Sequence, residues 1–130
     1  MYIKLFENFL GTQPLAAYSE LDPIDFNNKI YSERPNLEKM EAFTDSEVKL
    51  VGECLPKFDI QLSKLVDREQ SLDCILVCDH FTNRKLICNV TIIKFKDDWY
   101  YVRTMKYSDN KFYECDQLDG LKELLDKFNI

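Results

Sequence analysis

The sequence predicts an α+β domain, in which an antiparallel four- to five-stranded meander carries N-terminal and C-terminal helices packed on one face. Two observations lead to this prediction. Apolar residues in the second half of the chain alternate with polar ones, as they do in half-buried strands. Segments with the helical spacing of apolar residues precede and follow this region. Short polar turns between the strands make a meander the simplest assembly.

The length of 130 residues suits one domain, expected to span residues 1–130. Residues 44–130 are expected to form a helix–sheet–helix core. Residues 1–43 are expected to hold an N-terminal helix and an irregular segment. The chain contains only 3 glycines and 4 prolines, which argues against a disordered polypeptide.

The N-terminal helix is predicted from apolar residues that recur at helical spacing between Tyr2 and Leu10. A helix this short is marginal alone and must dock on something. It packs either on its own domain or on another protein, and the second alternative makes Phe6 and Phe9 candidate protein-binding residues. Residues 12–43 contain three of the four prolines and show no sustained period, so we expect an irregular connection there.

Residues 44–55 predict a helix with defined ends. Thr44 and Glu47 have the spacing of a capping box, in which each side chain satisfies a free amide at the helix start. Pro56 is expected to end the helix, because proline cannot donate a backbone hydrogen bond. The apolar face is expected to contain Val48, Val51 and Leu55.

From residue 58 onward the apolar period changes to two. The predicted strands cover residues 58–64, 73–79, 85–96, 98–107 and 111–115. Residues 65–72 are expected to form a polar connection, and residues 80–84 and 108–110 to form turns. The last segment predicts a helix that Asp116 caps and that buries Leu121, Leu125 and Phe128. Gly120 lowers the propensity of this helix by about 1 kcal/mol and indicates close packing.

The stretch KFKDDWYYVRT combines aromatic and charged residues around a predicted tight turn. Alternation along the strand places Tyr100 and Tyr101 on opposite faces, so they cannot stack on one ligand. Trp99, Tyr101 and Tyr107 could form a platform near Arg103. Core packing explains these residues best. The alternatives are a protein-binding patch, for which these four residues are candidates, and a nucleic-acid platform.

The net charge of −6 disfavours nonspecific contact with phosphate backbones or anionic lipid. A nucleic-acid-related role is therefore a second hypothesis with two opposite forms. The acidic surface could imitate DNA, although a net charge of −6 over 130 residues is small for a DNA mimic. The other form is a basic stripe along the hairpin, made of Lys94, Lys96, Arg103, Lys106 and Lys111.

The five cysteines show no zinc-knuckle spacing and are expected to be free buried thiols in a reducing compartment. The run CDH raises a third hypothesis, an enzyme built on Cys78 or Cys88 with His80. Cys78 and His80 would lie about 7 Å apart along a strand, which is too far for a direct hydrogen bond. No metal or cofactor site is predicted, because calcium-loop and phosphate-cradle motifs are absent from the sequence.

No segment of the sequence reaches the ~18 apolar residues of a membrane span. The first ten residues lack the pattern of a signal peptide. We therefore expect a cytoplasmic location and no membrane partner.

Two stretches, IKLFENF and DDWYYVR…FYECDQLDGLKELL, resemble small uncharacterised proteins of large tailed phages and related environmental sequences. The C-terminal stretch carries the more specific likeness, a tyrosine-rich hairpin followed by a glycine-containing helix. The resemblance implies a phage source and action inside a bacterial host or in a virion. It carries over no functional residue.

The leading hypothesis is a non-enzymatic accessory domain that binds another protein or a second copy of itself. It rests on the tyrosine-rich hairpin, on the possible docking helix at the N-terminus and on the long irregular segment. The phage resemblance adds the expectation of a host-directed factor in the host cytoplasm.

Overall fold

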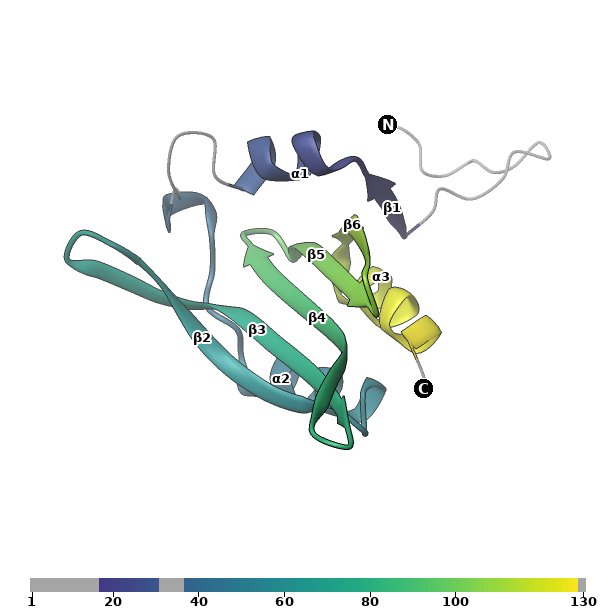
Figure 1. Ribbon diagram of the computed structural model, residues 1–130. Helices are drawn as coiled ribbons and strands as arrows, with labels where there is room; N and C mark the ends of the chain where they lie inside the picture. The colour runs from purple at the N-terminus through teal and green to yellow at the C-terminus, as the bar shows by residue number, and fades with distance from the viewer. Residues whose placement is uncertain (1–16, 31–36, 129–130) are drawn as a thin grey trace.

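The computed structural model describes residues 17–30 and 37–128 (Figure 1). The predicted helix at residues 2–10, and with it Phe6 and Phe9, lies outside the described residues. The strands are β1 (Tyr18–Leu21), β2 (Asp59–Asp67), β3 (Gln70–Thr82), β4 (Lys85–Phe95), β5 (Trp99–Lys106) and β6 (Asp109–Asp116). The helices are α1 (Pro23–Ile30), α2 (Asp45–Cys54) and α3 (Gln117–Leu125), with short 3₁₀ turns η1 (Leu37–Lys39) and η2 (Asp126–Phe128).

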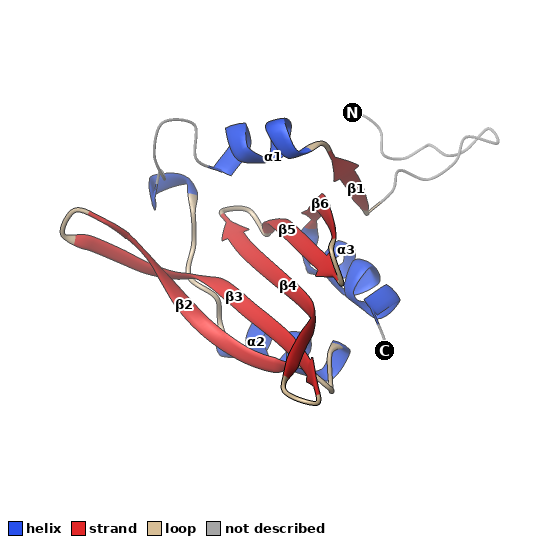
Figure 2. Cartoon of the chain, in the orientation of Figure 1, coloured by secondary structure: helices blue, strands red, loops and turns tan. Residues whose placement is uncertain are grey.

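The described strands form one antiparallel sheet of six strands in the order β1-β6-β5-β4-β3-β2 (Figure 2). The predicted α+β class and the meander from β2 to β6 are confirmed. The predicted number of four to five strands is too small, because β1 also pairs with β6 at one edge, with Tyr18 opposite Cys115. A four-residue strand within a proline-containing segment has too few alternating positions to be recognised from its sequence.

The β2–β3 hairpin is longer than predicted. Strand pairing continues to Asp67 and Gln70, so most of the expected polar connection belongs to the two strands. Arg68 adopts a positive φ of 59° in the turn between them. The prediction failed here because both faces of this part of the hairpin are largely open to water. Its side chains therefore lack the alternation of buried apolar and exposed polar residues by which a strand is recognised.

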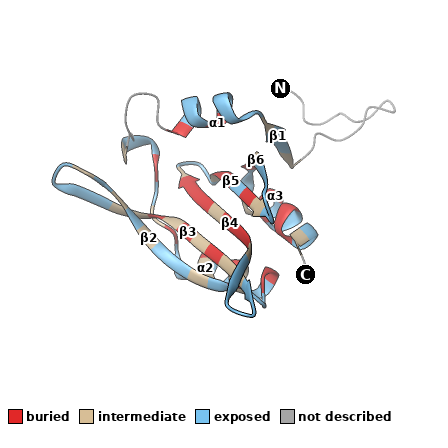
Figure 3. Ribbon diagram, viewed as in Figure 1, coloured by how far each residue is buried: buried red, intermediate tan, exposed pale blue. Residues whose placement is uncertain are grey.

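The larger core lies between the sheet and helices α2 and α3, which Figure 1 shows behind the sheet. Val51 and Leu55 come from the predicted face of α2, and both are almost fully buried. Leu121 and Leu125 of α3 pack on the same layer, as the spacing predicts, and Leu124 joins them. Phe128, in η2, is only partly buried against this core. Figure 3 shows the central β4 as largely buried and β2 at the edge as mostly exposed.

A second, smaller core lies on the opposite face of the sheet, under α1 and η1. It contains Phe26, Ile30, Met40, Cys74, Ile93 and Tyr101. The prediction that the helices pack on one face therefore holds for α2 and α3 but not for α1. The sequence gives little sign of α1, because only two of its eight residues are buried.

Residues 39–43 carry the chain from the face of the sheet covered by α1 to the face covered by α2, and they pass between the ends of β4 and β3. Lys39 accepts a hydrogen bond from the Lys96 amide at 3.0 Å, and Glu41 donates to the Lys94 carbonyl at 3.3 Å. Phe43 then donates to the Asp73 carbonyl at 2.9 Å and joins the larger core. This connection therefore fixes η1 beside the end of β4.

Candidate functional site

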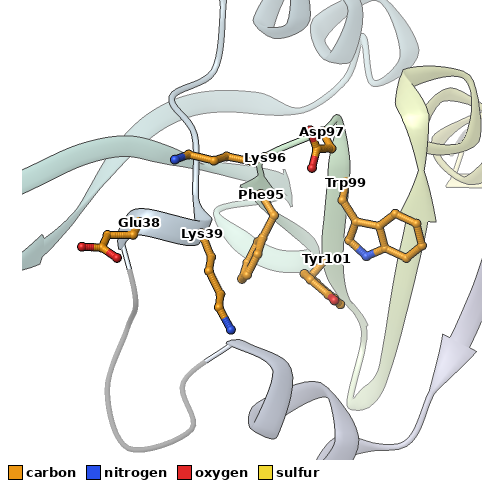
Figure 4. Close-up of a pocket in the computed structure, with 7 residues that line it drawn as sticks. All are labelled: Glu38, Lys39, Phe95, Lys96, Asp97, Trp99 and Tyr101. Atoms are coloured by element: carbon orange, nitrogen blue, oxygen red, sulfur yellow. The ribbon is translucent and has the colours of Figure 1, made fainter.

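A cleft of about 450 Å³ opens between η1 and the β4–β5 turn (Figure 4). Two elements far apart in the sequence form it, because residues 39–41 pair with the end of β4. Its lining combines three aromatic side chains, two lysines and two carboxylates: Phe95, Trp99, Tyr101, Lys39, Lys96, Glu38 and Asp97.

Tyr101 forms the floor of the cleft and is held between two other aromatic rings. Its ring centroid lies 4.8 Å from that of Phe95 in an edge-to-face arrangement, and 6.2 Å from that of Phe26 on α1. Pairs of this geometry stabilise each other beyond the area that they bury. With 8% of its surface exposed, Tyr101 is a core residue that still lines the cleft.

Trp99 contributes a buried polar group that forms no hydrogen bond of good geometry within the described structure. Its indole nitrogen Nε1 is buried and has no hydrogen-bond partner among the described residues. Figure 4 shows this nitrogen on the side of the ring that faces Tyr101. Burial raises the pKa of the Tyr101 hydroxyl, and the positive charge of Lys29 and, to a smaller extent, a hydrogen-bonding interaction with Trp99 oppose this effect. The indole N–H thus lies near the Tyr101 hydroxyl without meeting the geometry of a formed hydrogen bond. An unpaired buried N–H of this kind costs free energy unless a ligand or water satisfies it.

The β4–β5 turn holds Trp99 in place. Asp97 and Asp98 have φ values of 63° and 54°, a left-handed conformation that aspartate adopts more readily than most residues. The Asp98 carbonyl accepts a hydrogen bond of 2.8 Å from the amide of Gln117, at the start of α3. The turn and the first turn of α3 therefore support the cleft from outside.

The two lysines of the cleft form no ion pair with any described residue. In Figure 4 the Lys39 side chain extends alongside Phe95, whereas those of Lys96 and Glu38 point away from the rings. Lys39 is thus the cation best placed to meet a ligand that lies on the aromatic floor.

The structure brings together only part of the predicted aromatic platform. Trp99 and Tyr101 line the cleft, and Arg103 lies further along β5 in a separate hollow of about 340 Å³ with Phe26 and other residues. Tyr107 follows β5 in a turn, eight positions and about 26 Å of extended strand from Trp99. A single platform of Trp99, Tyr101 and Tyr107 is therefore wrong.

The predicted basic stripe does not form either. Lys94 is buried, with its Nζ 2.7 Å from Oε1 of Glu47. Strand register places Lys106 and Lys111 on the face of α2 and α3, because they pair with Cys88 and Thr104. Arg103 lies on the other face. Charges on two sides of a sheet cannot follow one phosphate backbone.

Glu47, Lys94 and Tyr100 form a buried polar network that sequence reasoning missed. The Tyr100 hydroxyl donates to Oε2 of Glu47 in a short hydrogen bond, and the Thr44 amide donates to Oε1 at 2.7 Å in the confirmed capping box. Burial alone would raise the pKa of Glu47, but hydrogen bonds from Lys94, Tyr100 and Thr44 hold it below its ordinary value. The sequence did contain a sign that Lys94 is buried, because alternation along the strand places it on the same face as the apolar Ile92.

The thiols are poorly suited to nucleophilic chemistry. All five cysteines are free and buried, as predicted. Burial raises the pKa of Cys78 to about 12, so it holds its proton at neutral pH. Nδ1 of His80 lies 3.0 Å from the carbonyl oxygen of Lys57. In the described part of the chain, no group of three or more histidine, cysteine or acidic side chains could hold a metal ion.

Comparison with models of protein families, with curated proteins and with solved structures found no match to this chain. The resemblance to phage proteins therefore stays a prediction. None of the helices within residues 17–30 and 37–128 has the length and apolar character needed to cross a membrane.

Proposed function

We propose that this domain is a non-enzymatic protein-binding module that holds an extended segment of a partner in the aromatic cleft. The observation that carries the proposal is the buried indole N–H of Trp99, which lies near the Tyr101 hydroxyl and forms no hydrogen bond of good geometry with the described residues, beside the rings of Tyr101 and Phe95. An extended peptide offers apolar side chains for the rings and carbonyl oxygens for the N–H, as in other aromatic-lined peptide grooves.

The charges around the cleft define the kind of segment that fits. Lys39 extends beside Phe95 without an ion pair to the described residues, so it would pair with a carboxylate of the ligand. Such a pair at a rim adds specificity and association rate more than affinity. We therefore expect a segment with an aromatic or proline residue followed closely by an acidic one.

The state of the reactive groups supports a binding role over catalysis. The thiol of Cys78 keeps its proton, and His80 lies outside the cleft against the ring of Phe58, at a centroid distance of 5.4 Å. A thiol nucleophile is activated by a base within hydrogen-bond reach or by a lowered pKa. Neither applies to Cys78.

The intrinsic fluorescence of Trp99, the only tryptophan in the chain, tests this proposal directly. Peptides selected from a random library on the immobilised full chain would be titrated while the emission is recorded. We expect binding to shift or quench the emission, because the indole lines the cleft. We expect Lys39→Ala to weaken binding by about fivefold, as for the loss of a rim charge pair.

Lys49→Ala is the matched control, because Lys49 is an exposed lysine on α2, which packs on the opposite face of the sheet. It should leave peptide affinity unchanged. Selected peptides that leave Trp99 emission unaltered, and that bind the Lys39→Ala chain as tightly as the unchanged one, would show that this cleft is not the binding site.

The resemblance to phage proteins extends the proposal to the partner's origin. We infer a bacterial host protein as the partner and the host cytoplasm as the location. A second copy of the chain is the alternative occupant. Sedimentation of the isolated chain at several concentrations separates these cases, since self-association through the cleft would also alter Trp99 emission with concentration.

A further inference from the structure

The hollow of about 340 Å³ that contains Arg103 lies between α1 and strands β3 to β6, and it shares no lining residue with the aromatic cleft. We call it the Arg103 hollow. Strand register places three of its residues in one row across the sheet, because Thr91 pairs with Arg103 and Arg103 pairs with Phe112. Side chains of directly paired residues point to the same face. The three side chains therefore belong to one surface, and its volume is within the range of small-molecule sites.

The walls of the Arg103 hollow are apolar and partly aromatic. The rings of Phe26 on α1 and Phe112 on β6 lie 4.7 Å apart between centroids, so α1 closes one side. Ile75 and Ile93 line the hollow from β3 and β4. Ile75 and Phe112 keep part of their surface exposed. These walls suit a planar ring, because aromatic pairs stabilise each other beyond the area that they bury.

A chain of hydrogen bonds fixes the polarity of Thr91 in the Arg103 hollow. Nδ2 of the buried Asn89 donates to Oδ1 of Asp79 at 2.6 Å, and a carboxylate can only accept. The amide oxygen of Asn89 therefore faces Thr91, and it accepts the Thr91 hydroxyl proton at 2.9 Å. Because this proton is already used, Oγ1 of Thr91 is left as an acceptor. A ligand in the hollow would have to bring the donor.

Arg103 supplies the positive charge of the hollow. It is exposed and forms no ion pair with any described residue. The carboxylate diagonally across from it is that of Glu114, which pairs with Nζ of Lys29 at 3.4 Å. A guanidinium group offers two parallel donors that match a carboxylate. Since neighbouring strands lie about 4.8 Å apart, a cation and a hydrogen-bond acceptor stand side by side above apolar walls.

We propose that the Arg103 hollow binds a small aromatic carboxylate that also carries a hydroxyl or amide N–H group. The carboxylate pairs with Arg103, the ring lies against Phe112 and the two isoleucines, and the N–H or O–H group donates to Thr91. An apolar acid without a donor would leave the Thr91 oxygen unpaired, which costs affinity. This site goes beyond the proposed function of the aromatic cleft and does not depend on it.

An NMR titration of the full chain tests the proposal through the amide chemical shifts. The probes are ortho-, meta- and para-hydroxybenzoate, which cover the separations between a carboxylate and a hydroxyl on one ring, with benzoate as their counterpart. We expect at least one isomer to shift the signals of β4, β5 and α1. Its dissociation constant should be about millimolar, as suits a ligand of about ten non-hydrogen atoms. It should bind about fivefold more tightly than benzoate, because it makes one more hydrogen bond.

Two variants separate the roles of the polar residues. Arg103→Gln should weaken binding of that isomer by about tenfold, because a charge-assisted pair is lost. Thr91→Val should remove the preference for the hydroxyl and leave benzoate affinity unchanged. A merely structural role of Thr91 would lower both affinities together and would contradict its assignment as the acceptor.

Lys39→Gln is the matched control, because it removes one positive charge from the aromatic cleft and none from the Arg103 hollow. It should leave the affinity unchanged, and the dispersion of the amide signals shows whether each variant is folded. A loss in Lys39→Gln as large as that in Arg103→Gln would overturn the proposal. So would the absence of any isomer that binds better than benzoate. Tighter binding of a tetrapeptide that ends in phenylalanine would also overturn it, in favour of a peptide carboxyl terminus as the occupant.

Discussion

At the scale of single residues, the most constrained feature is the network of Glu47, Lys94 and Tyr100. Lys94 and Tyr100 face each other across β4 and β5, and Glu47 reaches them from the first turn of α2. Glu41, which is half exposed, is a second partner of Lys94 at 3.2 Å. The network therefore fixes the position of α2 on the sheet by polar contacts inside an apolar layer.

Glu47→Gln is expected to lower the free energy of unfolding by about 3 kcal/mol, because it removes the charge that compensates the buried Lys94. Urea unfolding at neutral pH measures this loss. Glu41→Gln is the matched control and should cost about 0.5 kcal/mol, since its carboxylate is exposed to water. Similar costs for the two variants would show that Glu41 alone suffices to compensate Lys94.

The pH dependence of stability follows from the same pKa shifts. The folded-state pKa of Glu47 lies below its ordinary value of 4.5, so its contribution is present above pH 4.5 and is lost as the pH falls through the folded-state value. Burial tends to lower the pKa of Lys94, but the hydrogen bonds that Lys94 donates to Glu47 and Glu41 raise it above 10.5. Its contribution is therefore present below pH 10.5 and is lost as the pH rises through the folded-state value. Unfolding midpoints across pH should fall more gently on the acid side in Glu47→Gln.

At the scale of elements, the packing of α3 against the start of β1 depends on Gly120. A Cβ atom at this position would lie 2.3 Å from the backbone carbonyl oxygen of Ala17, which precedes β1. That oxygen also accepts a hydrogen bond from the Asp116 amide at 3.0 Å. The close packing expected from a glycine in this helix is thus confirmed, and it joins α3 to the edge strand.

Gly120→Ala should therefore destabilise the chain by about 2 kcal/mol, despite a gain of about 1 kcal/mol in helix propensity. Gly52→Ala in α2 is the matched control, because a Cβ there meets nothing within 4 Å. It should stabilise the chain by about 0.5–1 kcal/mol. Thermal unfolding of both variants measures the difference, and a shift of the same sign in both would contradict this account of Gly120.

At the scale of the whole molecule, the sheet separates two cores of unequal size. The larger core joins α2 and α3 to the middle strands, whereas the smaller one holds α1 through Phe26 and Ile30. Because α1 makes few buried contacts, we expect the smaller core beneath it to open by local unfolding at a lower free energy than the larger core. The aromatic cleft lies on this less stable face, where a bound segment would add contacts.

Phe26→Ala is expected to lower the opening free energy of α1 and β1 by about 3 kcal/mol while the central strands stay protected. Native-state amide hydrogen exchange measures both quantities. Leu124→Ala in the larger core is the matched control and should reduce protection in every element. Equal loss of protection in β4 and α1 after Phe26→Ala would mean that the two cores unfold as one unit.

Much of the fold could be predicted because it rests on local pattern. Alternation located β2 to β6, and the capping box located α2 within one residue. The predictions failed where the signal was not local. Strand β1 and helix α1 depend on docking to β6 and Phe112, and the 4.7 Å contact between the rings of Phe26 and Phe112 joins residues far apart in the sequence.

The sequence by itself determined which residues could share a face, because side-chain direction alternates along a strand and repeats along a helix. It therefore separated Tyr100 from Tyr101 and gathered the leucines of α3. Only the tertiary structure decided that each face of the sheet has its own core. It also decided that Lys94 is buried, and that η1 meets Trp99 to form a cleft. Those outcomes depend on which distant segments pack together, and no local period encodes that choice.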